Sequence, residues 1–473
     1  MVRRGLRALF WTHRWTGVVL ALLMVVWALS GIVMMYVAYP ETSREERLAG
    51  LAPLDFSHCC KAGLPALTSG SVEMLEGAPV LRWQGGEGVG TLRLSDGTSP
   101  RIEARDAAIV AASHLARSTG KAAPEPTVSA IAYDQWTVQG SSGREYPLYK
   151  ASFADPAGTV LYVSGQDGTV VQDTTRHERF WNWLGAVPHW LYFTQLRTDG
   201  QLWSQVVIYT SLLGTFLTVT GLYLGIRQYG RGKRRIPYRG MAWWHHVTGL
   251  LFGIFTLTWV LSGLFSMNPW GMMESQGAGA EAAALAGRQP ERADAEALIA
   301  ALRESVPTGT VTAELTMQGG TAFAILSDTR GKQARYSLPA LTPSPPSEAE
   351  LRARTAAALP GVAIASQRLL RGPDAYYYGH HGEVAFPVWR AIYRDADETR
   401  LYFDPATGEL LGKIDGPAQA FRWWHSALHR LDFGPLNSRP LWDIVTLPLM
   451  AGVSALCLIG LWLGIRRLRR SFR

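Results

Sequence analysis

The sequence predicts a membrane α-helical fold, in which four transmembrane helices form two duplicated two-helix halves and carry two α+β domains on one side of the bilayer. Three observations predict this fold. Four stretches of the 473 residues are strongly apolar, basic residues crowd at the ends of those stretches, and the chain aligns with itself over two halves. Charged residues are only 18% of the chain, against about 25% in ordinary soluble domains, and the 11% aromatic content excludes a disordered chain.

The four apolar stretches are the first elements of the prediction. A helix needs about 20 apolar residues to cross a hydrocarbon core of about 30 Å. The stretches that meet this length run from about Trp15 to Tyr39, Leu202 to Ile226, Val247 to Trp270 and Leu441 to Ile465. The first is too long for a signal-peptide core and lacks a persuasive cleavage site, so we expect an uncleaved anchor.

The basic residues predict the orientation. The net charge is +8, and its arginines and lysines cluster near residues 3–14, 227–239 and 466–473. Clusters at membrane boundaries follow the positive-inside rule, which argues against nucleic acid as a partner and places both termini in the cytoplasm. In a bacterial inner (cytoplasmic) membrane, the two long polar stretches would then be periplasmic domains of a multi-pass protein.

An internal repeat predicts the duplicated halves. The matching segments are His13–Gly17 with His245–Gly249, Trp27–Gly31 with Trp259–Gly263, Gly221–Arg227 with Gly460–Arg466, and His189–Phe193 with His429–Phe433. Each half begins and ends on the same side of the membrane. The repeats are therefore expected to be parallel, related by an axis along the membrane normal.

These signals divide the chain into seven parts. We expect helix one in 1–39, an external domain in 40–200 with an interfacial aromatic segment in 180–196, helix two in 201–228, a basic cytoplasmic loop in 229–241, helix three in 242–270, a second external domain in 271–438 with an aromatic segment in 421–433, and helix four with a basic tail in 439–473. Residue periodicity in the external domains predicts helices near 102–115, 293–302 and 348–359, and strands near 128–138, 148–153, 159–163, 310–315, 322–326, 388–393 and 400–403.

Four histidines are the candidate cofactor and metal ligands. His13 and His245 stand at the cytoplasmic starts of the first and third helices, and His189 and His429 stand in the two periplasmic aromatic segments. A bis-imidazole haem needs two histidines on opposite sides of a flat apolar slot. One pair at each membrane face therefore predicts two haems, and the absence of a Cys-x-x-Cys-His motif makes them non-covalent b-type haems.

Two choices within this set stay open. His246 adjoins His245, and His425 lies one turn before His429, so either neighbour is an alternative ligand. Glycines would let the helices stand apart around a porphyrin: Gly17, Gly31, Gly221, Gly225, Gly249, Gly263, Gly460 and Gly464. The competing interpretation is structural, because interfacial histidines beside tryptophan and small residues at helix contacts are common in haem-free membrane proteins.

Other chemistry-bearing residues form weaker candidates. The cluster His58-Cys59-Cys60 could bind metal or transfer electrons, but neighbouring cysteines rarely form a good disulfide and three residues are too few for a metal site. Cys457 is expected to pack inside the fourth helix. The run from Tyr376 to His381 is either an exposed contact for a ferric complex or a strand with solvent-facing aromatics.

The sequence resembles the PepSY-associated transmembrane family of bacteria over essentially its whole length. The residues that carry the resemblance are His13–Gly17, Trp27–Gly31, Gly185–Trp190, Leu196-Arg197, Tyr376–Tyr378, Phe386–Arg390, Tyr402–Gly408 and Leu428–Phe433. The resemblance implies that the two external domains are PepSY-like. Because the family includes inner-membrane ferric-siderophore reductases of the ferrioxamine B type, with two b-type haems in a four-helix domain, it also implies that oxidoreductase activity.

The expected activity is electron transfer across the membrane. Electrons would pass the His13/His245 haem, then the His189/His429 haem, and reduce a periplasmic Fe(III) siderophore or related ferric chelate. Some relatives carry a cytoplasmic flavin reductase domain, and none follows the fourth helix here, so the expected donor is a separate cytoplasmic flavoprotein or membrane quinol. The alternative is a haem-free regulatory or assembly module whose external domains bind partners.

Overall fold

The computed structural model describes residues 2–57, 59–60, 63–86, 88–138, 147–230, 235–380 and 384–472. Several positions within the segments described above lie outside these residues: His58 of the cysteine cluster, Arg231, Lys233 and Arg234 of the basic loop, His381 after the tyrosines, and Arg473 of the basic tail.

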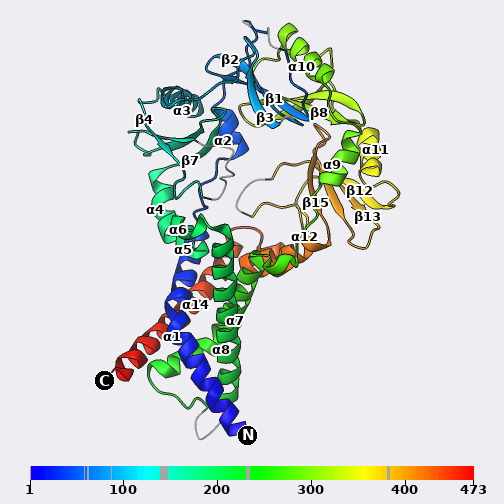
Figure 1. Ribbon diagram of the computed structural model, residues 1–473. Helices are drawn as coiled ribbons and strands as arrows, with labels where there is room; N and C mark the ends of the chain where they lie inside the picture. The colour runs from blue at the N-terminus through cyan, green and yellow to red at the C-terminus, as the bar shows by residue number, and fades with distance from the viewer. Residues whose placement is uncertain are drawn as a thin grey trace.

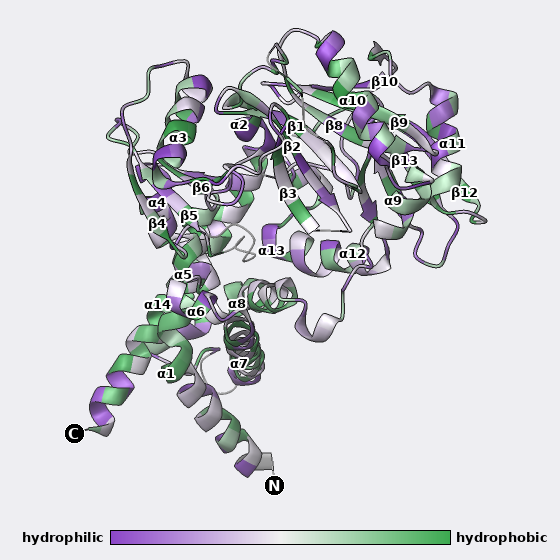
Figure 2. Cartoon of the chain, turned by 45° about the horizontal axis from the view of Figure 1, so that its top comes forward, coloured by the Kyte–Doolittle hydropathy of each residue, from purple (hydrophilic) through white to green (hydrophobic). Residues whose placement is uncertain are grey.

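Four long helices form a bundle at one end of the molecule (Figure 1). They are α1 (Val2–Met34), α7 (Gly200–Gln228), α8 (Met241–Ser266) and α14 (Leu441–Ser471). Each of the four is long and apolar enough to cross a membrane. In Figure 2 they are coloured mostly as hydrophobic, and the N- and C-termini lie at the same end of the bundle, which we call the basic end.

The helices are longer at the basic end than the apolar stretches predicted. Helix α1 begins at Val2, so His13 lies about three turns inside it rather than at its start. Helix α14 likewise continues through its arginines to Ser471. Apolar length reports only the part that matches hydrocarbon, whereas helical hydrogen bonding continues into the headgroup region, where arginine side chains reach water.

The bundle is closed by four helix–helix contacts. Helix α1 packs against α14 and α7, and α8 packs against the other sides of the same two helices. Its apolar core joins Leu20, Met24 and Ala28 of α1 to Val453 and Cys457 of α14. Cys457 is therefore buried in the bundle, as its position in an apolar stretch predicted.

Three antiparallel sheets form the opposite end, which we call the domain end (Figure 1). The central sheet has the order β11-β10-β9-β8-β1-β2-β3, and a four-stranded sheet lies on either side of it, in the orders β4-β5-β6-β7 and β12-β13-β14-β15. The strand bounds are β1 Ser69–Leu75, β2 Ala78–Gly85, β3 Gly88–Arg93, β4 Thr127–Ile131, β5 Leu148–Ser152, β6 Val160–Ser164, β7 Val170–Thr174, β8 Thr310–Gln318, β9 Thr321–Asp328, β10 Gln333–Ser337, β11 Thr342–Pro343, β12 Ile364–Leu370, β13 Val388–Tyr393, β14 Arg400–Phe403 and β15 Leu410–Ile414.

The central sheet joins the two polar segments of the chain. Strand β1 of the first segment pairs with β8 of the second, with Gly70 opposite Leu315 and Val72 opposite Ala313. The sequence analysis predicted neither this pairing nor the hairpins around it. Residues 40–200 and 271–438 therefore share one sheet, in addition to the four-stranded sheet that each forms by itself.

Short helices cover the sheets and connect them to the bundle. Their bounds are α2 Arg44–Ala49, α3 Ala104–Thr119, α4 Arg176–Leu184, α5 Ala186–Trp190, α6 Thr194–Arg197, α9 Gly279–Ala286, α10 Arg292–Glu304, α11 Glu348–Ala358, α12 Gly416–Phe421, the π-helical η2 Arg422–Ala427 and α13 Leu428–Arg430, with 3₁₀ turns η1 Pro269–Gly271 and η3 Gly434–Leu436. The predicted helices correspond to α3, α10 and α11. The predicted strand 128–138 is shorter than expected, because the chain leaves β4 after Ile131 and turns at Asp134.

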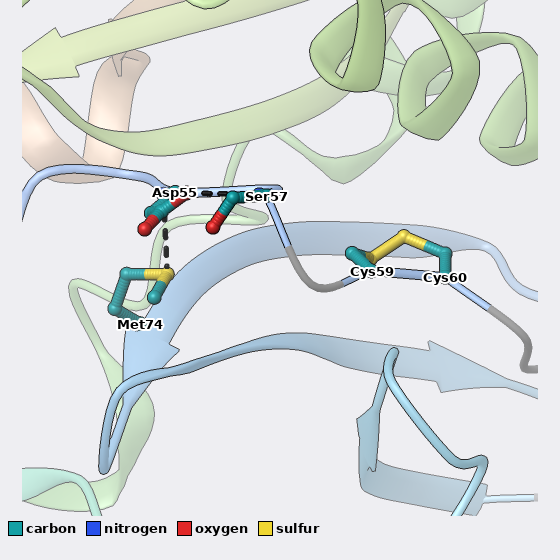
Figure 3. The surroundings of a disulfide bond; sticks show 5 residues. All are labelled: Asp55, Ser57, Cys59, Cys60 and Met74. Atoms are coloured by element: carbon teal, nitrogen blue, oxygen red, sulfur yellow. Dashed lines mark hydrogen bonds between the residues drawn. A yellow bond between two sulfur atoms is a disulfide. The ribbon is translucent and has the colours of Figure 1, made fainter.

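A disulfide joins Cys59 to Cys60 (Figure 3). The expectation that these neighbouring cysteines stay unpaired is therefore wrong. Both cysteines also pack against the apolar core of the central sheet, where Leu64 and Leu67 are buried. In Figure 3 the pair lies along the same segment as Asp55, whose backbone N–H contacts the sulfur of Met74 at 3.4 Å.

Candidate functional site

Two histidines meet where the domains join the bundle. His189 is on α5 and His429 is on α13, and the centroids of the two imidazole rings are 6.1 Å apart. Two rings that each placed a nitrogen about 2 Å from one metal, on opposite sides, would have centroids about 6 Å apart. The structure thus brings together the pair that the sequence predicted for this face.

Each of these rings is held by a helix of the bundle. The Nδ1 atom of His189 lies 3.2 Å from the carbonyl oxygen of Trp27 and 3.1 Å from the hydroxyl of Ser30. The Nδ1 atom of His429 has contacts of the same kind, 3.2 Å to the carbonyl of Trp259 and 3.0 Å to the hydroxyl of Ser262. A carbonyl only accepts hydrogen bonds, so Nδ1 carries the proton and Nε2 keeps its lone pair, as metal ligation requires.

His13 and His245 lie toward the basic end. The Nδ1 atom of His13 is 3.1 Å from the carbonyl of Leu217 on α7 and 3.2 Å from the hydroxyl of Thr220. His245 is turned toward the carbonyl of Leu456 on α14, without a hydrogen bond of standard geometry. Both side chains therefore cross from their own helix to a neighbouring one.

A glycine lies beneath each of the four rings. A Cβ atom added at Gly221 would lie 2.7 Å from Cε1 of His13, and one added at Gly460 would lie 3.4 Å from Cε1 of His245. At the domain end, a Cβ atom added at Gly31 would lie 3.5 Å from Cε1 of His189, and one added at Gly263 would lie 3.5 Å from Cε1 of His429. A Cβ added at the remaining predicted glycines would meet leucine or valine rather than a histidine, yet all four line the cavity at the basic end: Gly17, Gly225, Gly249 and Gly464.

A cavity of about 630 Å³ surrounds His13 and His245. Residues from all four long helices line it, and its volume lies within the usual range for cofactor sites. Five lining arginines are Arg14, Arg239, Arg466, Arg467 and Arg470. An apolar slot with two imidazoles and several guanidinium groups can hold a flat apolar ring system that carries carboxylates.

The two alternative histidines have different surroundings. His246 lines the same cavity, but its ring lies against Tyr238, with the two ring centroids 5.2 Å apart, rather than over a glycine. His425 lies on η2, stacks on His429 at 5.2 Å, and places Nδ1 2.9 Å from the carbonyl of Ser262. Sequence spacing placed His425 one turn before His429 but indicated neither the stack of the two rings nor the π-helical turn that contains His425; π-turns are frequent at functional sites.

The segments that carry His189 and His429 lie against the last two turns of α1 and α8, at the domain end of the bundle. Trp203 donates a 2.8 Å hydrogen bond from its indole to the carbonyl of Trp190, and Trp442 donates one of 2.6 Å to Arg430. His189 contacts α1 at Ser30, which is 17 residues, or about 25 Å, from His13 along the helix.

The tyrosine run does not form the exposed surface or the strand that the sequence suggested. Tyr378 is half-buried and donates a 2.9 Å hydrogen bond to the buried carboxylate of Asp432, which also pairs with His380. Burial, with Asp432 nearby, raises the pKa of Tyr378 to about 12, so this phenol remains a neutral donor. Tyr377 stacks on Tyr402. The tyrosine run therefore packs into the domain, and its partners Tyr402 and Asp432 are distant in sequence.

The donor set suits haem better than a bare ion. Across the described residues, no group of three or more His, Cys, Asp or Glu side chains could hold a metal ion. A bare zinc ion takes three or four protein ligands, whereas haem iron takes only axial ligands from the protein. Pairs of imidazoles over glycines therefore fit an iron porphyrin.

Comparison with known protein families gives a match over most of the chain. The family model described as "PepSY-associated TM region" matches residues 10–359, which include His13, His189 and His245. No curated protein matches the chain.

Proposed function

The chain belongs to the PepSY-associated TM family, and from that premise we propose that it is a di-haem electron carrier that reduces periplasmic Fe(III) siderophores or related ferric chelates. The observation that carries the proposal is the placement of the four histidines. Two lie near each end of the bundle, and each ring crosses to another helix at a glycine.

Corresponding contacts support a duplicated chain with parallel halves. His189 with Trp27 and Ser30 corresponds residue by residue to His429 with Trp259 and Ser262. Leu191 and Leu431, two residues after each of these histidines, both have positive φ angles near 55°. Both leucines are left-handed C-caps, of α5 and α13, so the two histidine-bearing helices end in the same way and the two segments correspond in backbone as well as in contacts.

We assign a ligand pair to each of the two proposed haems. His13 and His245 would be the ligands at the basic end, and His189 and His429 those at the domain end. The backbone carbonyls of Leu217, Trp27 and Trp259 orient the imidazoles. A b-type haem would supply a one-electron Fe(III)/Fe(II) couple at each position.

The charges around the cavity support both cofactor binding and orientation. The arginines that line it, among them Arg466, Arg467 and Arg470, can neutralise porphyrin carboxylates. The same residues follow the positive-inside rule, so we place the basic end in the cytoplasm of a bacterial inner membrane and the sheets in the periplasm.

The chemical outcome is release of iron from its chelate. One electron converts Fe(III) to Fe(II), which binds hard oxygen ligands less tightly. The electrons would come from a cytoplasmic flavoprotein or from a membrane quinol, which gives up two electrons and two protons on oxidation.

Haem content and chelate reduction test this proposal together. Purified wild-type protein should show a dithionite-sensitive Soret and α band with two haems per chain, and His13→Ala and His429→Ala should each lose one. His177→Ala is the matched control, because His177 is an exposed residue of α4 outside the site. When prereduced protein is mixed with ferrioxamine B, the haems of the wild type should be reoxidised, and reoxidation of His429→Ala should be slower. A colourless preparation from haem-replete cells would instead support the haem-free binding module.

A further inference from the structure

A second cavity, of about 340 Å³, lies between the central sheet and the first four-stranded sheet. It is bounded by the end of α2, by α3, by β1 and by the start of β7. Its apolar walls include Leu51, Leu75, Ile109 and Val170. None of the four candidate haem ligands lines this cavity, so an inference about it goes beyond the proposed function.

A buried ion-pair network forms the polar side of this cavity. The carboxylate of Glu73, whose side chain is 3% exposed, accepts a 2.9 Å bond from Arg47 and a 2.5 Å bond from Arg82. Burial alone would raise the pKa of Glu73, but the guanidinium groups of Arg82 and Arg47 hold that pKa below its ordinary value. Both oxygens of Glu73 are therefore ionised and occupied, and neither is free for a ligand.

His114 of α3 is the unusual residue of the cavity. It is 7% exposed, yet its side chain forms no hydrogen bond within the part of the chain that the structure describes. Burial, with Arg47 and Arg117 nearby, lowers the pKa of His114 to about 4, so the ring is neutral and keeps one N–H donor. Neither ring nitrogen of His114 is among the fully buried atoms that lack a partner, so the N–H is reached from the cavity that His114 lines, and a ligand there can accept a hydrogen bond from it.

The backbone is shaped to admit that ring. His114 packs directly over Gly50, the residue that ends α2, and a Cβ atom at Gly50 would overlap the imidazole. The position does not need glycine for its backbone conformation, because its φ of −84° is open to any residue. Glycine at residue 50 is thus needed for the space that His114 occupies.

The charges of the cavity favour an anion. Arg47 contacts Glu73 through Nη1 alone, and Arg117 has no carboxylate partner among the described residues. The second lining carboxylate, Glu76, pairs with Arg93 outside the cavity. Lining guanidinium groups therefore outnumber lining carboxylates, and Arg117 carries the uncompensated charge.

We propose that this cavity binds a small organic monocarboxylate. Its carboxylate accepts hydrogen bonds from Arg47, Arg117 and His114, and its apolar body contacts the aliphatic walls around Ile109. The volume is at the lower end of the range for ligand sites, which suits a short chain rather than a large chelate.

Calorimetry with the full chain in lipid nanodiscs tests the proposal, with butanoate as the probe and empty nanodiscs as the blank. Saturable one-to-one binding is expected. Removing a charged hydrogen bond should weaken it about tenfold or more in Arg117→Gln. Gly50→Ala should weaken it similarly, because it displaces the His114 ring without changing the lining charges. Arg105→Gln removes the same charge from an exposed position of α3 outside the cavity, and should bind like the wild type.

Three results would overturn the inference: no saturable butanoate binding, equal affinity in wild type and Arg117→Gln, or inorganic phosphate binding as tightly as butanoate. The last would show that the apolar walls contribute nothing. The experiment is independent of haem, since His13→Ala should bind butanoate normally even where it loses a cofactor.

Discussion

Replacing Gly221 with alanine is the sharpest test of the proposal that His13 is a haem ligand. Gly221 lies on α7 directly beneath the ring of His13, and it lines the cavity at the basic end. The substitution adds one methyl group and no charge. It also favours the helix by about 1 kcal/mol relative to glycine, so a loss of cofactor would not reflect loss of folding.

The size of the perturbation follows from one distance. The new Cβ would lie 2.7 Å from Cε1 of His13, whereas carbon atoms pack at about 3.5–4.0 Å. The ring must therefore move by about 1 Å, and liganding groups need to be held within about 0.5 Å of their productive position. We expect Gly221→Ala to lose the haem at the basic end and to keep the one at the domain end.

Haem-to-protein ratio by the pyridine haemochromogen assay is the measurement. Gly464→Ala is the matched control, because it lines the same cavity but its Cβ would lie at an ordinary 3.7 Å from Val18. Gly460→Ala, at 3.4 Å from His245, should retain its haem with a small spectral shift. If Gly221→Ala holds two haems with an unchanged spectrum, His13 is not held as a ligand against α7 and the reasoning fails.

Three further predictions follow from individual side chains. His429→Ala should lose the domain-end haem while His425→Ala keeps it, and equal loss in both would reverse that choice of ligand. Burial raises the pKa of Glu409 to about 7, so the folded state binds the carboxyl proton more tightly than the unfolded state. The free energy of unfolding should therefore fall by up to about 3 kcal/mol as pH rises from about 4.5 through 7. Glu409→Gln should flatten that pH dependence in urea titrations. Arg335→Met should cost about 2 kcal/mol, because a side chain 2% exposed loses charged hydrogen bonds, whereas Arg352→Met, in an exposed pair, should change the urea midpoint little.

Local patterns predicted the elements of the external domains well where the signal was strong. The predicted strands 388–393 and 400–403 have the bounds of β13 and β14, and the predicted helix 348–359 differs from α11 by one residue. The hairpin around Gly85 was missed, and strand β4 was overextended. Short strands rely on partners in the sheet, and those partners are not visible in a local window.

The candidate site shows the same division. Spacing alone placed His189 near one face of the membrane, but it did not reveal that Trp27 and Ser30 would hold the ring. It also suggested an exposed tyrosine run, which the buried carboxylate of Asp432 draws inward at Tyr378. Partners that are more than 50 residues apart meet only when the chain is packed.

The sequence by itself determined the four apolar helices, the basic clusters at their ends and the paired histidines, because hydrophobic length, charge and repetition are properties of residues in order. The tertiary structure alone decided that β1 pairs with β8, that each histidine lies over a glycine of another helix, and that His425 stacks on His429. These are contacts between distant segments, and their energies depend on which surfaces packing brings within a few ångströms of each other.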